Sequence, residues 1–513
     1  MLQPTILLTL CCYWITSWPV AAELGGIDTL IYHGVRQNNS TWRDIDRIDE
    51  YYAEPSACFH LGEVEQNLNS EKETLATILE IDTALTPHDS LTVFLNFLYG
   101  GRKDKEYSID FLAENWDDGH IPLLIDILYL IPDQWLISEL ADLLQQHTNA
   151  AYGTDYFSWL QWLWRQDPVY QENYSDFKAE LYRHIDQRFE KYFLKRHNLS
   201  KIRLDEVVWG GVPQDGIPPL RYPDMLESQQ ADYLAKTDIV FGVYVDGEAR
   251  AYPKRILAWH EFFTDRIGGV DITGVYCTLC GTVIAYDSEF DGVKHTLGTS
   301  GFLYRSNKLM YDQGTQSLWS TIWGRPVIGP LIDQNISLKS HPVVTTTWEN
   351  WKERHPQTLV LSQNTGHERN YDEGAAYRQY FATDRLMFPV PREDSRLKNK
   401  DEVLVIRVPD FEDDPLAIST DYLKKSRIYQ GEVAQTPFVV LTEKDGASRV
   451  FQRQNHDFLS YRKGVLLDRA GNQWTVDEDQ LMDVQGAILN RLPSHRIFWF
   501  AWINTYPQTR LIR

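Results

Sequence analysis

The sequence predicts an α+β protein, with an N-terminal all-helical domain followed by two divergent copies of a β-rich domain. Three observations predict this fold class. Apolar residues recur at three and four positions up to about residue 198, short alternating runs separated by turn residues follow from about residue 207, and motifs of 238–360 recur in 401–513. The predicted parts are a signal peptide 1–22, a helical domain 23–200, a linker 201–237, a first β-rich repeat 238–360, a connection 361–400 and a second repeat 401–513.

The first element is a predicted secretory signal. An apolar run at 6–15 precedes the small residues Val20-Ala21-Ala22, a pattern that signal peptidase cleaves, here after Ala22. The Lys or Arg that usually precedes the apolar run is missing. The alternative is an uncleaved anchor helix, which the short run and Pro19 disfavour. We therefore expect a periplasmic or secreted protein.

Composition narrows the function classes. The net charge of −22 argues against nucleic acid as a partner, because phosphates require clustered Lys and Arg. No segment of the mature chain has the roughly 20 uninterrupted apolar residues that a membrane span needs. Removal of the signal leaves too few cysteines for a disulfide-built scaffold, namely Cys58, Cys277 and Cys280. Cys58 is expected to be a buried thiol without a role.

The helical domain is predicted from apolar residues that share one face of successive helices. Ile121, Leu124, Ile125 and Leu128 have this spacing, and the pattern continues through 135–144 and 157–164. Short polar turns separate these segments. A helical-hairpin array is therefore expected, although no repeat period is visible.

The first β-rich repeat is predicted from paired strands. Residues 240–245 and 249–252 flank Asp246-Gly247, which predicts a hairpin with a primed turn. Residues 270–275 and 282–286 form a second predicted pair, with both cysteines in the connection. The Cys-x-x-Cys motif is therefore expected between two strands.

The second β-rich repeat is predicted from an internal duplication. Two Trp residues and a following Pro-Gln-Thr have identical spacing in 348–358 and 499–509, and the run Met310-Tyr311-Asp312 with Trp319 matches Leu466-Leu467-Asp468 with Trp474. Where the first copy has Cys277 and Cys280, the second has approximately 443–446, and Leu466 replaces Met310. The fold therefore does not need these sulfur side chains, which favours a functional role for them.

Several motifs in order resemble a bacterial family, domain of unknown function 3179. They lie mainly within 240–360 and include 247–253, 257–261, Tyr276-Cys277-Thr278-Leu279-Cys280-Gly281 and 300–307. Thr278 stands where the family usually has Pro, and Thr264-Asp265 where Asn-Asp is more familiar. The resemblance implies an extracytoplasmic protein and supplies no established reaction, so no catalytic residue is assigned.

The residues of the first repeat predict a soft-metal site. His260, Cys277, Cys280 and Met310 offer an imidazole, two thiolates and a thioether, a set that suits copper(I), with zinc as the alternative. Groups that hydrogen-bond to these ligands and orient them are expected among Glu261, His295, Asp312 and Arg305. The corresponding function is a redox or metal-handling role.

Other interpretations of the same residues stay open. Met310 is compatible with simple core packing, and His260 with a buried, hydrogen-bonded histidine. The cysteines are also compatible with a structural disulfide, or with a zinc knuckle completed by His260 with His295 or Asp312. A thiol–disulfide exchange site is less favoured, because exchange sites normally begin a helix. The contrasting hypothesis is a non-enzymatic interaction protein, with an unknown protein or small molecule as partner.

Overall fold

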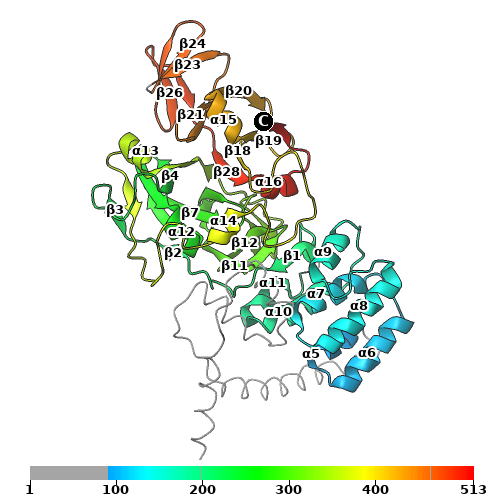
Figure 1. The fold of residues 1–513 in the computed structure, drawn as a ribbon. Helices are drawn as coiled ribbons and strands as arrows, with labels where there is room; N and C mark the ends of the chain where they lie inside the picture. The colour runs from blue at the N-terminus through cyan, green and yellow to red at the C-terminus, as the bar shows by residue number, and fades with distance from the viewer. Residues whose placement is uncertain (1–89, 197, 463) are drawn as a thin grey trace, which may run out of the picture. The chain divides into compact units, whose positions relative to one another are not determined.

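The structure is a computed structural model that describes residues 90–196, 198–462 and 464–513. The predicted signal peptide, the first part of the predicted helical domain and Cys58 lie outside the described residues. Within the described ranges, no helix has the length and apolar character needed to cross a membrane. A helical region comes first and a large β-rich region follows, as the apolar spacing predicts (Figure 1).

The helical region consists of short amphipathic helices. Asp133 caps α8 by accepting a hydrogen bond from the Leu136 amide (3.2 Å), and α8 ends where Asn149 takes a left-handed conformation. The apolar faces of the helices form one core. The helices are α5 (Ser90–Tyr99), α6 (Arg102–Glu114), α7 (His120–Leu130), α8 (Gln134–Thr148), α9 (Tyr156–Trp164), α10 (Tyr174–Arg183) and α11 (Glu190–Phe193), with η3 (Gln187–Phe189) before α11 and η4 (Leu204–Glu206) after it.

The first β region forms three five-stranded sheets and a small β9–β10 hairpin. The sheet orders are β16-β4-β5-β17-β3, β15-β8-β7-β6-β2 and β1-β11-β12-β13-β14. The predicted hairpins at 240–252 and 270–286 are confirmed as β4–β5 and β7–β8. The bounds are β1 (Val207–Trp209), β2 (Leu220–Arg221), β3 (Met225–Glu227), β4 (Ile239–Val245), β5 (Glu248–Pro253), α12 (Lys254–His260), β6 (Phe262–Ile267), β7 (Val270–Cys277), β8 (Thr282–Asp287), β9 (Glu289–Phe290), β10 (Val293–Lys294), β11 (Leu297–Tyr304), β12 (Asn307–Asp312), β13 (Leu318–Ser320), β14 (Arg325–Ile328), β15 (Ser340–His341), β16 (Val343–Thr347), α13 (Trp348–Arg354) and β17 (Leu359–Leu361).

The second β region forms sheets in the orders β28-β18-β19-β29, β20-β21-β22 and β23-β24-β25-β26-β27. Helix α14 (Arg378–Ala382) lies in the segment before it. The bounds are β18 (Glu402–Ile406), β19 (Leu416–Ser419), α15 (Thr420–Ser426), β20 (Ile428–Val433), β21 (Thr436–Thr442), β22 (Ser448–Gln452), β23 (Phe458–Arg462), β24 (Val465–Asp468), β25 (Gln473–Val476), β26 (Gln480–Asp483), β27 (Ile488–Asn490), β28 (Ser494–Phe498), α16 (Trp499–Thr505) and β29 (Arg510–Ile512).

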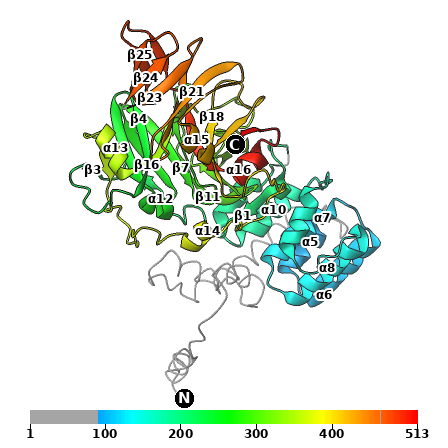
Figure 2. The same cartoon turned by 45° about the horizontal axis from the view of Figure 1, so that its top comes forward.

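The sheets β16-β4-β5-β17 and β28-β18-β19-β29 have the same strand order and pairing sense. In each, the first two strands along the chain are antiparallel, the third pairs antiparallel with the first, and the last pairs parallel with the second. A helix follows the second strand (α12 or α15) and another precedes the last (α13 or α16). Helix α13 lies beside β4 in both views (Figures 1 and 2).

The segment 201–237, expected as a linker, supplies edge strands to the first β region. Strand β1 pairs with β11, β2 with β6 and β3 with β17. One side of the β11–β14 sheet shares its core with the helices: the Phe302 ring lies 4.8 Å from that of Phe189 and 5.1 Å from that of Phe193. The helical and first β regions are therefore joined through this sheet.

Candidate functional site

The cysteine motif forms the turn between β7 and β8. Cys277 ends β7 and pairs with Thr282, the first residue of β8. Cys277 and Cys280 are joined by a disulfide, with their Cα atoms 5.2 Å apart, and both side chains are buried. Gly281 closes the turn in a left-handed conformation (φ +61°). The motif therefore lies between strands, as expected from the sequence, and not at the start of a helix.

The disulfide turn packs against the second β region. The Phe498 amide donates a hydrogen bond to the Cys280 carbonyl (2.8 Å), and the Tyr380 hydroxyl donates one to the Leu279 carbonyl (2.7 Å). Both cysteines belong to the apolar core that contains Phe498 and much of the β18–β19 sheet. The turn is therefore a contact between the two β regions.

A second tight turn, between β11 and β12, meets the disulfide. Tyr304 pairs with Asn307, so Arg305 and Ser306 form a two-residue turn, and both have positive φ (+50° and +60°). Asn307 Oδ1 lies 3.1 Å from Cys280 Sγ. Non-glycine residues in such a turn require support from their surroundings.

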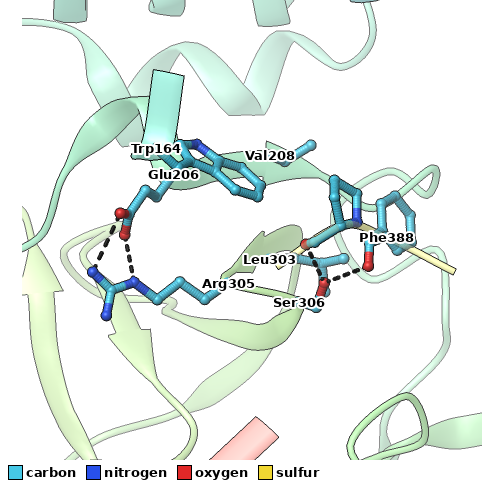
Figure 3. Close-up of a pocket in the computed structure, with 8 residues that line it drawn as sticks. Trp164, Glu206, Val208, Leu303, Arg305, Ser306 and Phe388 are labelled. Atoms are coloured by element: carbon cyan, nitrogen blue, oxygen red, sulfur yellow. Dashed lines mark hydrogen bonds and ion pairs between the residues drawn. The ribbon is translucent and has the colours of Figure 1, made fainter. Parts of the chain in front are cut away.

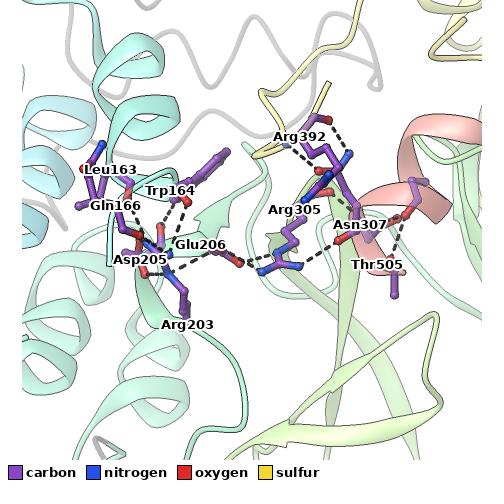
Figure 4. Close-up of polar contacts among 12 residues, drawn as sticks. Leu163, Trp164, Gln166, Arg203, Asp205, Glu206, Arg305, Asn307, Arg392 and Thr505 are labelled. Carbon is purple, nitrogen blue, oxygen red and sulfur yellow. Dashed lines mark hydrogen bonds and ion pairs between the residues drawn. The ribbon is translucent and has the colours of Figure 1, made fainter. Parts of the chain in front are cut away.

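Ser306 and Arg305 supply that support through their side chains. The Ser306 hydroxyl lies 3.1 Å from the carbonyl oxygen of Phe388 and 2.9 Å from that of Pro389 (Figure 3). The guanidinium of Arg305 binds the Glu206 carboxylate (2.6 Å) and donates a hydrogen bond to the Asn504 carbonyl (2.9 Å; Figure 4). Arg305 thus links the segment after the helices to α16.

The polar network around Arg305 continues on both sides. Asn504 Oδ1 accepts a hydrogen bond from the Arg392 amide (2.9 Å), and Nδ2 donates one to the Arg392 carbonyl (3.0 Å). On the other side, Arg203 binds Asp205 (2.7 Å) and the Gln166 carbonyl (3.0 Å; Figure 4). These residues join the helical region, the first β region and the second β region at one place.

A small cavity lies beside this turn, lined in part by Trp164, Glu206, Arg305, Ser306 and Phe388 (Figure 3). Its volume is about 10 Å³. That space holds about one water molecule and no substrate.

His260 ends α12 in a separate buried environment. Its Nδ1 lies 2.9 Å from the Pro218 carbonyl, an acceptor, so Nδ1 carries the proton, and Nε2 accepts from the Tyr371 hydroxyl (2.6 Å). Burial lowers the pKa of His260 to about 4. The imidazole is therefore neutral near pH 7, the form that binds metals, but its lone pair is engaged by Tyr371.

Met310 lies in a third environment. It is fully buried in a core with Phe262, Val275 and Trp319, and it pairs with Trp319 across β12 and β13. This core contains neither cysteine and not His260. The thioether therefore packs as an apolar side chain in this structure.

The residues expected to orient the metal ligands also lie in several separate contacts. His295 Nδ1 lies 3.2 Å from Asp312 Oδ2, and Asp312 in turn accepts a hydrogen bond from the Thr315 amide (2.7 Å). Glu261 forms a buried ion pair with Lys308 and accepts a hydrogen bond from the Tyr377 hydroxyl (3.1 Å). Tyr377 packs against the core of the disulfide.

Of the predicted site residues, the structure brings the two cysteines together. Arg305 lies in the neighbouring turn, whose Asn307 contacts Cys280. Across 90–196, 198–462 and 464–513, no group of three or more His, Cys, Asp or Glu is arranged to hold a metal ion. Copper or zinc binding stays a prediction. Sequence reasoning missed Phe498 and Asn504, although comparison of the similar segments 348–358 and 499–509 offers a signal: Asn504 stands where the first segment has Glu353, an exposed charged residue.

Comparison with known proteins gives one family match. A family model described as Protein of unknown function (DUF3179) matches residues 214–509, beyond the 240–360 stretch that carries most of the resemblance. No curated protein and no solved structure matches the chain. The match covers more than half of the 513 residues and spans both β regions. The chain therefore belongs to this family of proteins of unknown function, DUF3179.

Proposed function

We propose that the Cys277–Cys280 disulfide is structural, fixing the turn by which one of two divergent copies of a β fold docks on the other, and that the protein is an extracytoplasmic interaction protein. One observation carries this proposal. The turn of the second region that matches the cysteine turn docks on the first region in the same manner, and it contains no sulfur.

The two turns match by strand register and by contact. The cysteine turn is flanked by the strand pair Cys277–Thr282, and the matching turn of the second region is flanked by the strand pair Thr442–Ser448. Asp445 accepts hydrogen bonds from the Thr347 amide (3.2 Å) and the Thr346 hydroxyl (2.6 Å). Thr347 is the N-cap of α13, just as Phe498, which binds the Cys280 carbonyl, is the N-cap of α16.

Each copy thus holds the strand–helix junction of the other copy. Strand β28 lies beside β8 of the first region, and β16 lies beside β22 of the second. The shared strand order of the β16-β4-β5-β17 and β28-β18-β19-β29 sheets supports the same duplication. Docking is the property that both turns have in common, so the disulfide is interpreted as a means of fixing one turn.

The soft-metal function remains a second candidate. It is favoured by the neutral state of His260, because a metal ligand must be unprotonated. In this candidate, two molecules of an external thiol reduce the disulfide by exchange, becoming a disulfide themselves and leaving two thiolates. Displacement of Tyr371 frees the imidazole, with copper, or alternatively zinc, as the bound ion. The expected ligands are His260, Cys277, Cys280 and Met310.

The experiment compares a Cys277→Ser/Cys280→Ser double variant with Asp445→Ala, its counterpart in the other turn. For protein purified from the periplasm, elemental analysis measures bound metal and thermal denaturation measures stability. We expect unchanged metal content and lower stability in both variants, by about 2 kcal/mol for loss of a short disulfide loop. Loss of bound copper or zinc in the cysteine variant alone would overturn the structural proposal.

A further inference from the structure

The two matching meander sheets differ in what covers them. In the β11–β14 sheet, Leu309 and Tyr311 belong to the core of the helical region. Matching Met310 with Leu466 places Val465 and Leu467 at these positions in the β23–β27 sheet. Val465 is 44% exposed and Leu467 half-buried. The described part of the chain therefore covers one sheet with helices and leaves the matching face of the other open.

The open face carries a row of apolar residues. The strand registers place Val465, Thr475, Met482 and Ile488 side by side on four neighbouring strands. Met482 is 37% and Ile488 48% exposed, whereas Leu466, Trp474 and Leu481 on the alternate positions are buried. We call Val465, Met482 and Ile488 the outer apolar face.

The β23–β27 sheet and its turns carry much of the exposed apolar surface. Five of the twelve large hydrophobic residues that are exposed in the described ranges lie here: the three of the outer apolar face, Leu459 (53%) in β23 and Val484 (77%) in the turn after β26. Contiguous exposed apolar surface commonly marks a site of protein interaction. The β23–β27 sheet is therefore the strongest candidate for a docking surface.

Charge indicates the class of partner. Asp477 and Asp479 are exposed in the turn where β25 ends and β26 begins, exposed Arg462 pairs with Val465 at the β23 edge, and the whole chain has a net charge of −22. Such a charge opposes the approach of a second copy and favours a basic partner. The matching sheet indicates the shape of the partner, because helices cover it. Aromatic side chains from the segment of α10, η3 and α11 pack on Phe302 there, with ring centroids 4.8 to 5.9 Å apart.

We propose that the outer apolar face binds an amphipathic helix of another protein, whose apolar stripe is flanked by Lys and Arg. This rests on the interaction role proposed above and names its partner class. Four neighbouring strands span about 14 Å, which matches roughly three turns of a helix. The aliphatic side chains of the face contact the stripe, and Asp477 and Asp479 attract the basic flank.

The test uses a fluorescently labelled amphipathic peptide of about 18 residues, with Leu and Phe on one face and Lys beside it, long enough for the required turns. A scrambled peptide of the same composition controls for charge alone. Anisotropy titrations compare the wild-type protein with Val465→Ser/Met482→Ser/Ile488→Ser and with Val293→Ser, an exposed substitution on β10. We expect roughly tenfold or greater weakening in the triple variant and none in the control.

Other outcomes overturn the inference. If the wild-type protein and the triple variant bind the peptide with equal affinity, the peptide binds elsewhere. If the scrambled peptide binds as well as the amphipathic one, binding depends on charge alone. Self-association of the wild-type protein in sedimentation, abolished in the triple variant, would assign the face to a second copy. Because the cysteine and Asp445 variants are assayed separately for metal and stability, failure of this surface is distinguishable from failure of the proposed structural disulfide.

Discussion

The β11–β12 hairpin and its counterpart β23–β24 show how the two β regions differ. When the pairs Met310–Trp319 and Leu466–Trp474 are matched, β12 begins three residues before Met310, but β24 begins only one residue before Leu466. The longer hairpin carries the Arg305-Ser306 turn and Asn307, which contact the helical side, the connection and the disulfide. The first region thus has a longer hairpin at the place where three parts of the chain meet.

The second region contributes a different junction. Glu478 is buried, and its carboxylate lies 2.9 Å from Arg354 Nε and 3.2 Å from His355 Nε2 at the end of α13. It also binds Arg449 and Arg491 of its own region. Burial alone would raise the pKa of Glu478, but the three arginines and the hydrogen bond from His355 hold it well below its usual value. At one junction the docking turn is closed by its own disulfide, the other junction is ionic, and both connect the same two regions.

The largest expected effect comes from removing the centre of the ionic junction. Glu478→Gln leaves two buried guanidiniums, of Arg449 and Arg491, and the partly exposed one of Arg354 around a neutral side chain, so the free energy of unfolding should fall by about 3–5 kcal/mol. Urea denaturation measures this loss. Glu412→Gln is the matched control, because Glu412 also binds an arginine of the first region, Arg325, at a partly exposed position, where about 1 kcal/mol or less is expected. Similar losses in both variants would contradict an ionic junction.

A paired glycine substitution compares the two docking turns directly. Gly281 and Gly446 both have positive φ (+61° and +95°), but a Cβ on Gly281 would lie 2.6 Å from the Phe498 ring, whereas one on Gly446 would first meet the flexible Lys424 side chain at 3.1 Å. Alanine should therefore cost about 3 kcal/mol at 281 and about 1 kcal/mol at 446. Chemical denaturation midpoints check the difference. Equal costs would mean that the cysteine turn is no more tightly docked than its counterpart.

Local patterns predicted much of the fold. The helices and hairpins follow from apolar spacing and from turn residues such as Asp246-Gly247, which act within a few residues. The position of the cysteines between strands was predictable for the same reason. By contrast, the contact between the Cys280 carbonyl and Phe498 joins residues far apart in the sequence, and no local pattern encodes it.

The candidate site shows the same division. Residue type grouped Met310 with the cysteines, but side chains alternate along a strand. Asn307 and Met310 are three residues apart on β12 and therefore face opposite sides, so the side chain near Cys280 is Asn307, and Met310 enters the core of Trp319. The choice between these faces depends on the tertiary partner of β12, which composition does not specify.

The smallest expected effect tests the end of α12 against the end of α15. Both helices have seven residues and are followed by a residue with positive φ, but His260 is buried where Ser426 is exposed. The pKa of His260 is lowered by burial from 6.5 to about 4, so the unfolded chain binds more protons between these values. Its contribution to stability is therefore complete above pH 6.5 and lost as the pH falls toward 4, at up to about 1.4 kcal/mol per pH unit.

His260→Asn retains a donor for the Pro218 carbonyl and removes this titration, so the variant should be less stable at pH 7.5 but lose less stability between pH 7 and pH 5 than the wild-type protein. Ser426→Asn is the matched control at the end of α15, and it should leave the pH dependence unchanged, because an exposed uncharged residue does not titrate. Urea denaturation at each pH measures the difference. If His260→Asn keeps the full pH dependence of the wild-type protein, the acid sensitivity arises from other groups, and the buried histidine does not distinguish the first region from the second.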